Sequence, residues 1–377
     1  MKALVAGAGI GGLAAGVALR KTGHEVEIFE RSNELREIGA GLMIWPNGVR
    51  ALEALGVGIK ALKVEGVSIR SWRGARLMEL PIAEISKRHG SDVVFVHRAD
   101  LQAALADSFG RDGLRLGADI RRFQDDAAQV AITLRDGTLA TGDLLVGADG
   151  LRSAVRRQLL GDGDPTFLGS TIWRGTLGAE GIALRPGHGV NWFGNGSEFL
   201  AFFLADERIY WAGVTKEPKG EKAGPGGHKQ DLLERFEHWV EPVPSLIAAT
   251  DGRAILRNDM YDRPPVRQWS AGRVTLLGDA AHPMSPNAGQ GACQALEDAV
   301  ALGDSLRRAP DLAGAFELYE RRRLRRANRV VAMSRQGSRS VQIENPLLAG
   351  IRDGLGRLLP RWVLVRMLDA TLPAPRD

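Results

Sequence analysis

The first thirty residues carry glycines and a carboxylate at the spacing that a dinucleotide site requires. Residues 7–12 read Gly-Ala-Gly-Ile-Gly-Gly, the pattern G-x-G-x-x-G, and they separate the apolar run 2–6 from a stretch with helical spacing. Glu30 ends a second apolar alternation, near the ~20-residue offset at which a carboxylate accepts hydrogen bonds from a ribose. Glycines let a pyrophosphate approach the backbone, and a helix N-terminus supplies free N–H groups. The segment therefore predicts strand, turn, helix and strand around a dinucleotide.

A second glycine-rich turn lies near residue 290. Residues 273–277 have the pattern of a buried strand and end in Gly278-Asp279. Residues 286–291 then read Pro-Asn-Ala-Gly-Gln-Gly and precede a helical stretch that contains Cys293. This order predicts another ligand cradle made of backbone N–H groups. Cys293 is expected to be a buried small apolar residue rather than a redox thiol.

Three further positions could contact a nucleotide or a flat ligand. The apolar run 144–146 leads into Gly147-Ala148-Asp149-Gly150, a third turn of small residues. Arg98 precedes a predicted helix over 100–109, where its guanidinium could hold a phosphate or pair with a carboxylate. Gly41 belongs to a turn of small residues that would let the backbone approach a flat ligand, although the pattern alone favours an ordinary loop.

The composition is that of a globular chain that binds no nucleic acid. The 377 residues are 44% hydrophobic and 25% charged, with a net charge of +5. The densest basic run, 321–326, lacks aromatic interleaving, so we expect a solvated or phosphate-facing helix side. The single cysteine excludes an internal disulfide and a cysteine-rich metal site. The chain begins on its first predicted strand and has no apolar run of the ~18 residues that a membrane span needs, so we expect a cytoplasmic protein.

The segment 166–267 has a different pattern from the rest. Short alternating runs and most of the tryptophans lie in or next to it. This predicts a mostly antiparallel sheet with an aromatic-rich face, a Gly-, Lys- and Pro-rich loop over 216–229 and a covering helix over 231–240. The sheet is the expected place of substrate selection. Candidate pocket residues, for most of which core packing is the simpler role, are Trp45, Trp173, Phe193, Phe203, Trp211 and Asn287.

The C-terminal part is predicted to be helical. A long basic helix is expected over 319–334, and a further helical stretch over 345–372 contains Trp362. The spacing of apolar residues in this second stretch predicts an amphipathic cover. Docking on a membrane surface is an alternative, because the opposite side carries arginines, but packing against the protein itself is favoured. The apolar residues of this pattern are Leu347, Ile351, Leu355 and Leu358 or Leu359.

Three motifs, in this order, resemble the fingerprints of a known family. They are residues 7–12 with Glu30, residues 142–150 with Arg152, Ser153 and Arg156, and Gly278-Asp279 with residues 286–291. Together they are similar to those of the single-component FAD-dependent aromatic hydroxylases, the p-hydroxybenzoate hydroxylase-like and salicylate hydroxylase-like flavoprotein monooxygenases. The resemblance spans nearly the whole chain and implies an α/β fold. The expected parts are a Rossmann-like FAD-binding domain (1–65, 97–165 and 268–335), a mostly antiparallel substrate domain (66–96 and 166–267) and a C-terminal helical segment (336–377).

The resemblance implies tightly bound FAD and gives roles to individual residues. Gly7, Gly9 and Gly12 would hold the pyrophosphate, and Glu30 the adenosine ribose. Asp149 and Gly150 would contact FAD and a passing NAD(P)H, and Asp279 would accept from the ribityl chain. Residues 289–292 would lie beside the isoalloxazine ring, where a helix N-terminus stabilises negative charge on reduced flavin. The expected FAD-binding residues are Gly7, Gly9, Gly11, Gly12, Glu30, Arg31, Gly41, Arg98, Asp149, Gly150, Asp279, Gly289, Gln290, Gly291 and Ala292.

The chemistry that the resemblance implies is oxygenation without a metal. NAD(P)H would reduce the flavin, O2 would add to give a C4a-hydroperoxide, and its distal oxygen would hydroxylate or epoxidise an aromatic or unsaturated small molecule. No base is identifiable; His282, His97 and Tyr210 are candidates, although a histidine beside a glycine-rich loop is more often a structural hydrogen bonder. A monomer or homodimer is expected.

Two departures from the family pattern bear on the substrate. Family urate hydroxylases use an arginine on a substrate-domain strand and an aspartate in the flavin-side loop. Here those positions fall near Glu198 and at Asn287, so urate is disfavoured. The alternatives are a flavin-dependent halogenase or reductase of the same superfamily, and a flavin-binding protein without turnover. The Trp-x-Trp-x-Ile-Pro signature of many halogenases is absent.

Overall fold

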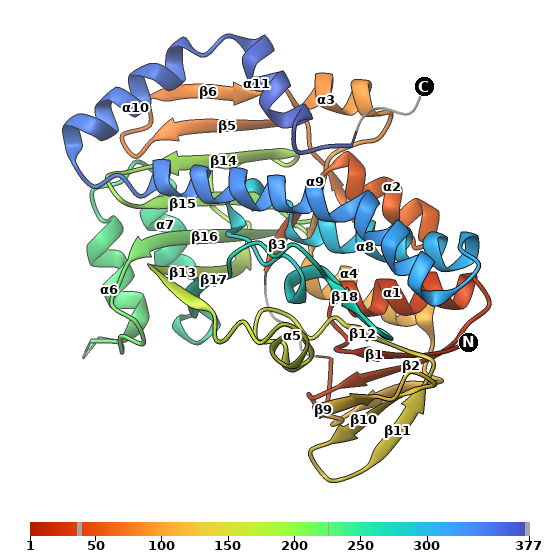
Figure 1. Cartoon of the computed structure of the whole chain (residues 1–377). Helices are drawn as coiled ribbons and strands as arrows, with labels where there is room; N and C mark the ends of the chain where they lie inside the picture. The colour runs from red at the N-terminus through yellow and green to blue at the C-terminus, as the bar shows by residue number, and fades with distance from the viewer. Residues whose placement is uncertain (36–39, 225, 374–377) are drawn as a thin grey trace.

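A computed structural model describes residues 1–35, 40–224 and 226–373 (Figure 1). Parts of the predicted loop over 216–229 and of the C-terminal segment fall outside these residues. A six-stranded sheet in the order β18-β19-β12-β1-β2-β8 is parallel apart from the β18–β19 pair. Its strands are β1 (Lys2–Ala6), β2 (Glu25–Glu30), β8 (Leu114–Leu116), β12 (Leu144–Gly147), β18 (Ser270–Ala271) and β19 (Val274–Leu276).

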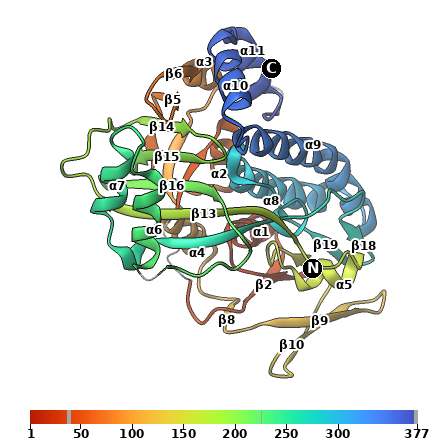
Figure 2. The ribbon, with the colours of Figure 1, turned by 90° about the vertical axis from the view of Figure 1, so that its left-hand side faces the viewer.

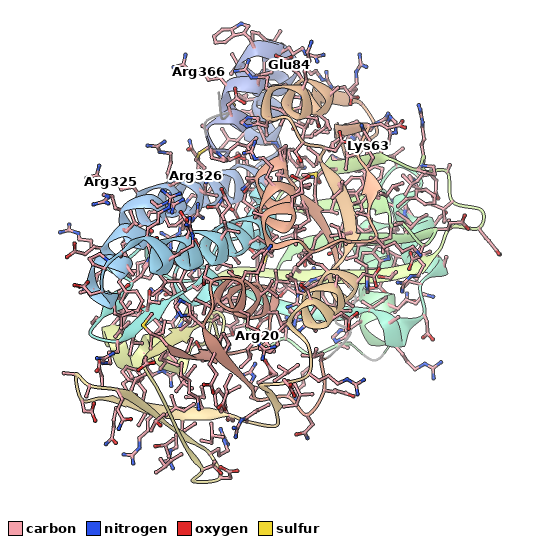
Figure 3. All side chains as sticks on the ribbon, turned by 90° about the vertical axis from the view of Figure 1, so that its right-hand side faces the viewer. Arg20, Lys63, Glu84, Arg325, Arg326 and Arg366 are labelled. Atoms are coloured by element: carbon pink, nitrogen blue, oxygen red, sulfur yellow. The ribbon has the colours of Figure 1, made fainter. Side chains whose placement is uncertain are left out.

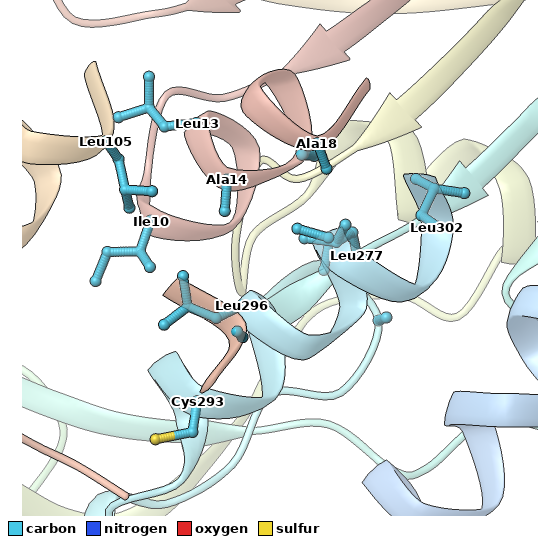
Figure 4. Close-up of a cluster of buried hydrophobic side chains, with 14 of the residues drawn as sticks. Ile10, Leu13, Ala14, Ala18, Leu105, Leu277, Cys293, Leu296 and Leu302 are labelled. Atoms are coloured by element: carbon cyan, nitrogen blue, oxygen red, sulfur yellow. The ribbon is translucent and has the colours of Figure 1, made fainter. Parts of the chain in front are cut away.

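Three helices pack together against this sheet. They are α1 (Ile10–Lys21), α4 (Arg98–Phe109) and α8 (Gly291–Arg308). Small residues let α1 and α8 approach closely, since a Cβ built at Gly303 would lie 3.2 Å from the Ala18 Cβ. Figure 4 shows the apolar contacts, with Ile10 of α1 facing Leu296 of α8. Because helices cover it, the central strand β1 reads as a continuous apolar run.

A seven-stranded sheet in the order β17-β13-β16-β15-β14-β5-β6 forms the second layer system. It is antiparallel apart from the β5–β14 pair, and α6 (Gly227–Phe236) and α7 (Val243–Ala249) cover one of its faces (Figure 2). Its strands are β5 (Gly66–Ser71), β6 (Arg76–Leu80), β13 (Thr166–Gly178), β14 (His188–Phe193), β15 (Glu198–Phe203), β16 (Arg208–Lys216) and β17 (Leu256–Asp262).

Two three-stranded sheets, β3-β7-β4 and β11-β10-β9, and several helices accompany the large sheets. The smaller strands are β3 (Gly41–Ile44), β4 (Leu62–Lys63), β7 (Val94–His97), β9 (Ile120–Asp125), β10 (Val130–Leu134) and β11 (Leu139–Gly142). The other helices are α2 (Pro46–Leu55), α3 (Ile82–His89), α5 (Ala154–Leu160), α9 (Leu312–Val341), α10 (Pro346–Leu358) and α11 (Arg361–Asp369), with 3-10 turns η1 (Gly252–Ala254), η2 (Gly278–Ala280) and η3 (Pro286–Ala288).

The predicted α/β fold class is confirmed, but the basic helix differs from expectation. Two arginines of the run 321–326 point inward: Arg323 Nε lies 2.7 Å from Asp298 Oδ1, and Arg326 Nη1 lies 2.5 Å from Glu297 Oε1. Only part of the run, including Arg325, is the solvated side that was predicted (Figure 3). These ion pairs attach the basic helix, α9, to α8.

The predicted helical stretch over 345–372 is divided. Pro360 separates α10 from α11, because a proline disfavours helical backbone in the residue before it. Within the described ranges, no helix is both long and apolar enough to cross a membrane. The domain boundaries given above stay a prediction.

Candidate functional site

The glycines of residues 7–12 have different surroundings, which together suit a phosphate-binding turn. Gly7 has φ +95°, and a Cβ built there would lie 2.7 Å from the Ala148 carbonyl oxygen. A Cβ at Gly12 would lie 1.9 Å from the Gly7 carbonyl oxygen, so this glycine permits the tight packing of α1 on the turn. A Cβ at Gly9, the N-cap of α1, would meet no atom within 4 Å. The open space at Gly9 is where a pyrophosphate can approach the helix N-terminus.

Glu30 lies beside this turn at the end of β2. Its Oε2 accepts a 2.8 Å hydrogen bond from the Ala8 N–H, and its Oε1 accepts a 2.9 Å hydrogen bond from the Ser32 N–H. These bonds fix the carboxylate while leaving lone pairs that can accept from ribose hydroxyls. Arg31, the next residue, is exposed. Gly11 is a packing residue, since a Cβ there would lie 2.8 Å from the Leu277 side chain.

Asp149 caps α5. Its Oδ2 accepts a 2.7 Å hydrogen bond from the Ala154 N–H, and its Oδ1 accepts from the Ser153 hydroxyl at 2.5 Å. Burial raises the pKa of the Asp149 carboxyl above its usual range, and these hydrogen bonds oppose the rise. Gly150 has φ +78°, and a Cβ there would face open space. Because Asp149 is engaged with its own chain, its direct contact with FAD and NAD(P)H stays a prediction.

Arg156 connects the second motif to the third. Its side chain is fully buried, and Nη1 donates 3.0 Å hydrogen bonds to the carbonyl oxygens of Ala280 and Ala281. Its Nε donates a 2.6 Å hydrogen bond to Asp162. Arg156 therefore holds in place the loop that carries Asp279.

Asp279 lies in η2, directly after β19. Its side chain is accessible to solvent, whereas Gly278 and Ala280 on either side are buried. Desolvation by the surrounding protein still raises the pKa of the Asp279 carboxyl above its usual range, and His282 and Arg98 oppose the rise. An accessible carboxylate enclosed by protein in this way can accept hydrogen bonds from the hydroxyl groups of a ligand.

One cation, Arg98, lies near this carboxylate, and a second, Arg174, lies near Arg98. Arg98 begins α4, directly after the buried His97. Desolvation lowers the pKa of the Arg98 guanidinium. The charge of Asp279 raises this pKa, and the charge of Arg174 lowers it further. Arg174 comes from β13, and its buried Nε has no hydrogen-bond partner in the described part of the chain. Positive charge is thus available where a phosphate-bearing cofactor would pass.

The loop before α8 surrounds a buried indole. Gly289 has φ +59°, and a Cβ there would lie 3.2 Å from Trp45 Nε1. That Nε1 is buried and has no hydrogen-bond partner among the described residues. Gln290 is also buried: its Oε1 accepts a 3.0 Å hydrogen bond from Asn47, and its Nε2 likewise lacks a described partner. Helix α8 starts with Gly291 and Ala292. Two buried N–H donors without a described partner, Trp45 Nε1 and Gln290 Nε2, lie beside this start and indicate a ligand with acceptor atoms.

One face of the seven-stranded sheet is turned toward these loops. Side-chain alternation puts Glu198, Leu200 and Phe202 of β15 on this face, and strand pairing puts Tyr210 of β16 opposite Phe202. A Cβ at Gly41 would lie 2.5 Å from the Tyr210 ring, so the backbone of β3 rests on the sheet here. Gly41 therefore has a packing reason to be glycine. We refer to this side as the ligand-facing side of the sheet.

A buried carboxylate stands on the ligand-facing side. Glu198 Oε1 accepts a 2.8 Å hydrogen bond from Asn287 Nδ2, and Asn191 of β14 also hydrogen-bonds to it. Burial raises the pKa of Glu198 to about 7, and the two amides and Arg352 oppose the rise. The Oδ1 atoms of Asn287 and Asn191 are buried without a partner in the described residues. This corner of the site presents hydrogen-bond acceptors.

Three of the expected pocket residues lie on the other face of the sheet. Trp173, Phe203 and Trp211 belong to an apolar cluster with α6 and α7. Trp211 Nε1 donates a 2.9 Å hydrogen bond to Thr250, and Trp173 Nε1 donates a 2.8 Å hydrogen bond to Thr215. Their place in this cluster agrees with core packing, the simpler role given for most of these candidates. Alternation separates the two faces of a sheet without telling which one the helices cover. Trp45 and Asn287 lie at the loops described above, and pairing with Glu198 puts Phe193 on the ligand-facing side.

The candidate bases are also separated by the structure. His282 is buried beneath the Asp279 loop, with Nε2 2.5 Å from Asp298 Oδ2. Although burial would raise the pKa of Asp298, His282 and Arg323 lower it to about 2. His282 thus belongs to a structural ion-pair network away from the sheet. Tyr210 does face the ligand side, and burial raises its pKa to about 12, which makes it a hydrogen-bond donor rather than a base.

The sequence reasoning did not single out three polar residues of this site, Asn47, Arg174 and Asn191. A polar side chain on the same strand face as apolar neighbours was the signal available for Arg174 and Asn191. No such signal existed for Asn47, whose partners Gln290 and Glu297 are more than 240 positions away in sequence.

Fold and site together define a flavoprotein in which three loops form a dinucleotide cradle against a substrate sheet. The chain belongs to the family described as FAD binding domain, whose model matches residues 1–334. The predicted cofactor, FAD, and the predicted class, a flavoprotein monooxygenase, are confirmed by this match and by the relatives.

Two curated relatives and one solved structure show the similarity. The chain is 40% identical over 360 residues to the aurachin C monooxygenase/isomerase of Stigmatella aurantiaca, covering 94% of each. It is 36% identical over 343 residues to the FAD-dependent urate hydroxylase of Klebsiella pneumoniae subsp. pneumoniae, covering 89% of each. The crystal structure of Klebsiella pneumoniae HpxO complexed with FAD and uric acid matches 100% of this chain and 97% of that one, with a TM-score of 0.93 at 32% identity.

Proposed function

We propose that this monooxygenase takes electrons from NAD(P)H and transfers one oxygen atom of O2 to a neutral aromatic or unsaturated small molecule bound beside Glu198. The observation that carries the proposal is the hydrogen bond between the buried Glu198 and the half-buried Asn287, which joins the ligand-facing side of the sheet to the loop before α8. Around it the sheet presents apolar surface, including Leu200 and Phe202. An apolar surface with a few converging polar groups is the usual form of a small-molecule site.

The residues of the cradle fit FAD. Gly9 leaves open the approach to the N-terminus of α1, and Glu30 and Asp279 offer carboxylates to hydroxyl groups. Trp45 and Gln290 offer buried donors that have no described partner in the protein. Bound FAD supplies the electron transfer and the activation of oxygen, which side chains alone do not provide. The chain carries one complete dinucleotide fingerprint, which supports transient rather than stable binding of NAD(P)H.

The polar corner favours a substrate that donates hydrogen bonds. Glu198 and the free amide oxygens of Asn287 and Asn191 can accept from an N–H or O–H group of the ring. With a pKa of about 7, the Glu198 carboxylate can also take a proton from a phenol as oxygen is transferred. A substrate carboxylate in this corner would be repelled, so benzoates and the urate anion are poor candidates. Phe202, stacked on Phe95 with ring centroids 4.1 Å apart, helps exclude water.

The test is NAD(P)H oxidation by the FAD-loaded protein with a panel of neutral phenols, N-heteroaromatic compounds, benzoates and urate. We expect a neutral compound to stimulate oxidation and to gain one oxygen atom from isotopically labelled O2, as measured by product mass. Stimulation by benzoates or urate alone would contradict the substrate class. Oxidation that yields only hydrogen peroxide with every compound, or none at all, would contradict the monooxygenase reaction proposed for this site.

A further inference from the structure

The exposed large apolar side chains of the described residues gather on the last two helices. Of ten such residues, seven lie on α10 and α11. The most exposed of these seven are Leu358 (78%), Leu347 (73%) and Trp362 (66%). The others of this group are Leu348, Ile351, Leu355 and Met367. Scattered exposed apolar residues are ordinary, but a group of this size marks an interaction surface. The sequence pattern favoured packing of these leucines on the protein, and that expectation was wrong.

The apolar residues of α10 form one stripe that faces away from the molecule. At 100° per residue they fall within an arc of about 80°. The stripe consists of Leu347, Ile351, Leu355 and Leu358. The opposite side of α10 packs on β6, since a Cβ at Gly356 would lie 3.0 Å from the Met78 side chain. Figure 1 shows both helices at the outer edge of the seven-stranded sheet. We call this exposed surface the α10–α11 face.

The unpaired charges of the two helices are positive. Arg357 and Arg366 are exposed and form no ion pair with any described residue. The acidic groups of the same helices are neutralised, because Asp353 pairs with Arg352 at 2.8 Å and Asp369 pairs with Arg88 at 2.7 Å. Arg366 points outward at the end of the molecule in Figure 3. Leucines, a tryptophan and free arginines on one exposed helical surface are the composition of an interfacial amphipathic segment.

We propose that the α10–α11 face binds an anionic membrane surface, with the apolar stripe entering the headgroup region and Arg357 and Arg366 meeting lipid phosphates. A second copy of the chain fits less well. A two-fold interface brings a patch against itself, so it would bring the unpaired arginines of both copies together. An anionic lipid surface complements both the stripe and the charge.

The docking surface is attached to the substrate sheet. From the inner side of α10, Arg352 donates a 3.1 Å hydrogen bond to the Gly194 carbonyl oxygen. Its guanidinium also lies over the Phe193 ring, 5.3 Å from the centroid. Docking would therefore place the membrane on the outer side of a helix whose inner side contacts the connection from β14 to β15, where Phe193 and Glu198 lie. The proposal does not depend on the identity of the substrate.

The experiment is co-sedimentation of the full FAD-loaded chain with vesicles. One set contains phosphatidylcholine alone, and the other contains phosphatidylcholine with phosphatidylglycerol. The apolar variant is Leu347→Ser/Leu358→Ser/Trp362→Ser, and the charge variant is Arg357→Glu/Arg366→Glu. Leu139→Ser, at an exposed leucine on β11, is the matched control. Thermal melting checks each variant, and because the changed residues are exposed the melting temperatures should match.

We expect the protein to bind the anionic vesicles, and each multiple variant to bind at least about 10-fold more weakly, while Leu139→Ser binds normally. Absence of binding to the anionic vesicles would overturn the proposal. So would a dimer, detected by size-exclusion chromatography with light scattering, that the apolar variant converts to a monomer, because the face would then belong to a second copy. If the apolar variant melts early, the charge variant decides: unchanged binding by it would also overturn the proposal.

Discussion

Asn287 donates a 2.8 Å hydrogen bond from Nδ2 to Oε1 of Glu198, which joins the loop before α8 to a strand of the substrate sheet. The two residues are 89 positions apart in sequence; Glu198 is buried, and Asn287 is half-buried. Burial raises the pKa of Glu198 to about 7, so its charge changes within the range in which enzymes work. This pair is the most distinctive chemical feature of the site.

Glu198 should make stability depend on pH. Its pKa is raised from 4.5 to about 7 in the folded chain, so folding favours the protonated form. Well below pH 4.5 both states are protonated, and the free energy of unfolding is unaffected by this group. Between about pH 4.5 and pH 7 only the unfolded state loses its proton, so the free energy of unfolding falls by about 3 kcal/mol in total and levels off above pH 7. Glu198→Gln should remove this loss, so the variant should be more stable than the parent at about pH 8 and similar at about pH 4.5. Urea unfolding across this range measures the effect.

The matched control is Glu53→Gln, at an exposed position on α2. It should keep the parent's pH dependence. A Glu198→Gln protein whose stability falls with pH as steeply as that of the parent would show that the Glu198 carboxyl is not the titrating group.

Substitution of two glycines of the same turn by alanine should affect different properties, FAD affinity at Gly9 and stability at Gly12. Gly9→Ala puts a methyl group into open space, at an ordinary φ of −72°, so the chain should fold normally but lose FAD affinity. Gly12→Ala would place Cβ 1.9 Å from the Gly7 carbonyl oxygen, which should cost about 3 kcal/mol of stability or more. Thermal melting of the flavin-free proteins and flavin absorbance after gel filtration separate the two effects. Equal melting temperatures, or full flavin content in Gly9→Ala, would contradict this account.

The turn could be predicted from the sequence because its determinants are local. Glycine spacing, an apolar strand and Glu30 all lie within thirty residues, and backbone geometry dictates their arrangement. Contacts between elements that are far apart in sequence could not be predicted from local patterns. Alternation on β16 separates Tyr210 from Trp211, but only the positions of α6 and α7 decide which of them faces the ligand.

The C-terminal helix shows the same limit. The spacing of its apolar residues correctly predicted an amphipathic helix. However, the same spacing occurs whether the apolar side packs on the protein or remains exposed, as it does at Leu358. Arg323 gives the opposite case: a residue of a basic run that was expected to be solvated is buried against Asp298.

The two faces of the substrate sheet should have separable roles. Leu200→Ala, on the ligand-facing side, should raise KM for the substrate because it removes apolar contact area. Trp211→Phe, on the other face, loses a buried hydrogen bond to Thr250 and should cost about 2 kcal/mol of stability while leaving KM unchanged. Steady-state kinetics and urea unfolding of both variants provide the check. A changed KM in Trp211→Phe with normal KM in Leu200→Ala would reverse the assignment of the faces.

Asp279 should determine how tightly FAD is held. Its accessible carboxylate can accept from cofactor hydroxyls, and loss of a hydrogen bond to a charged group costs about 2 kcal/mol, so Asp279→Ala should weaken FAD binding by roughly 30-fold. The flavin-free variant should not be destabilised, because desolvation already disfavours the Asp279 charge, as its raised pKa shows. Asp107→Ala, at an exposed position on α4, is the control. Fluorescence titration of the flavin-free proteins with FAD gives the affinities. Unchanged FAD affinity in Asp279→Ala would remove the third loop from the cofactor site, whereas a fall in both affinity and melting temperature would mean that the residue supports the loop rather than the cofactor.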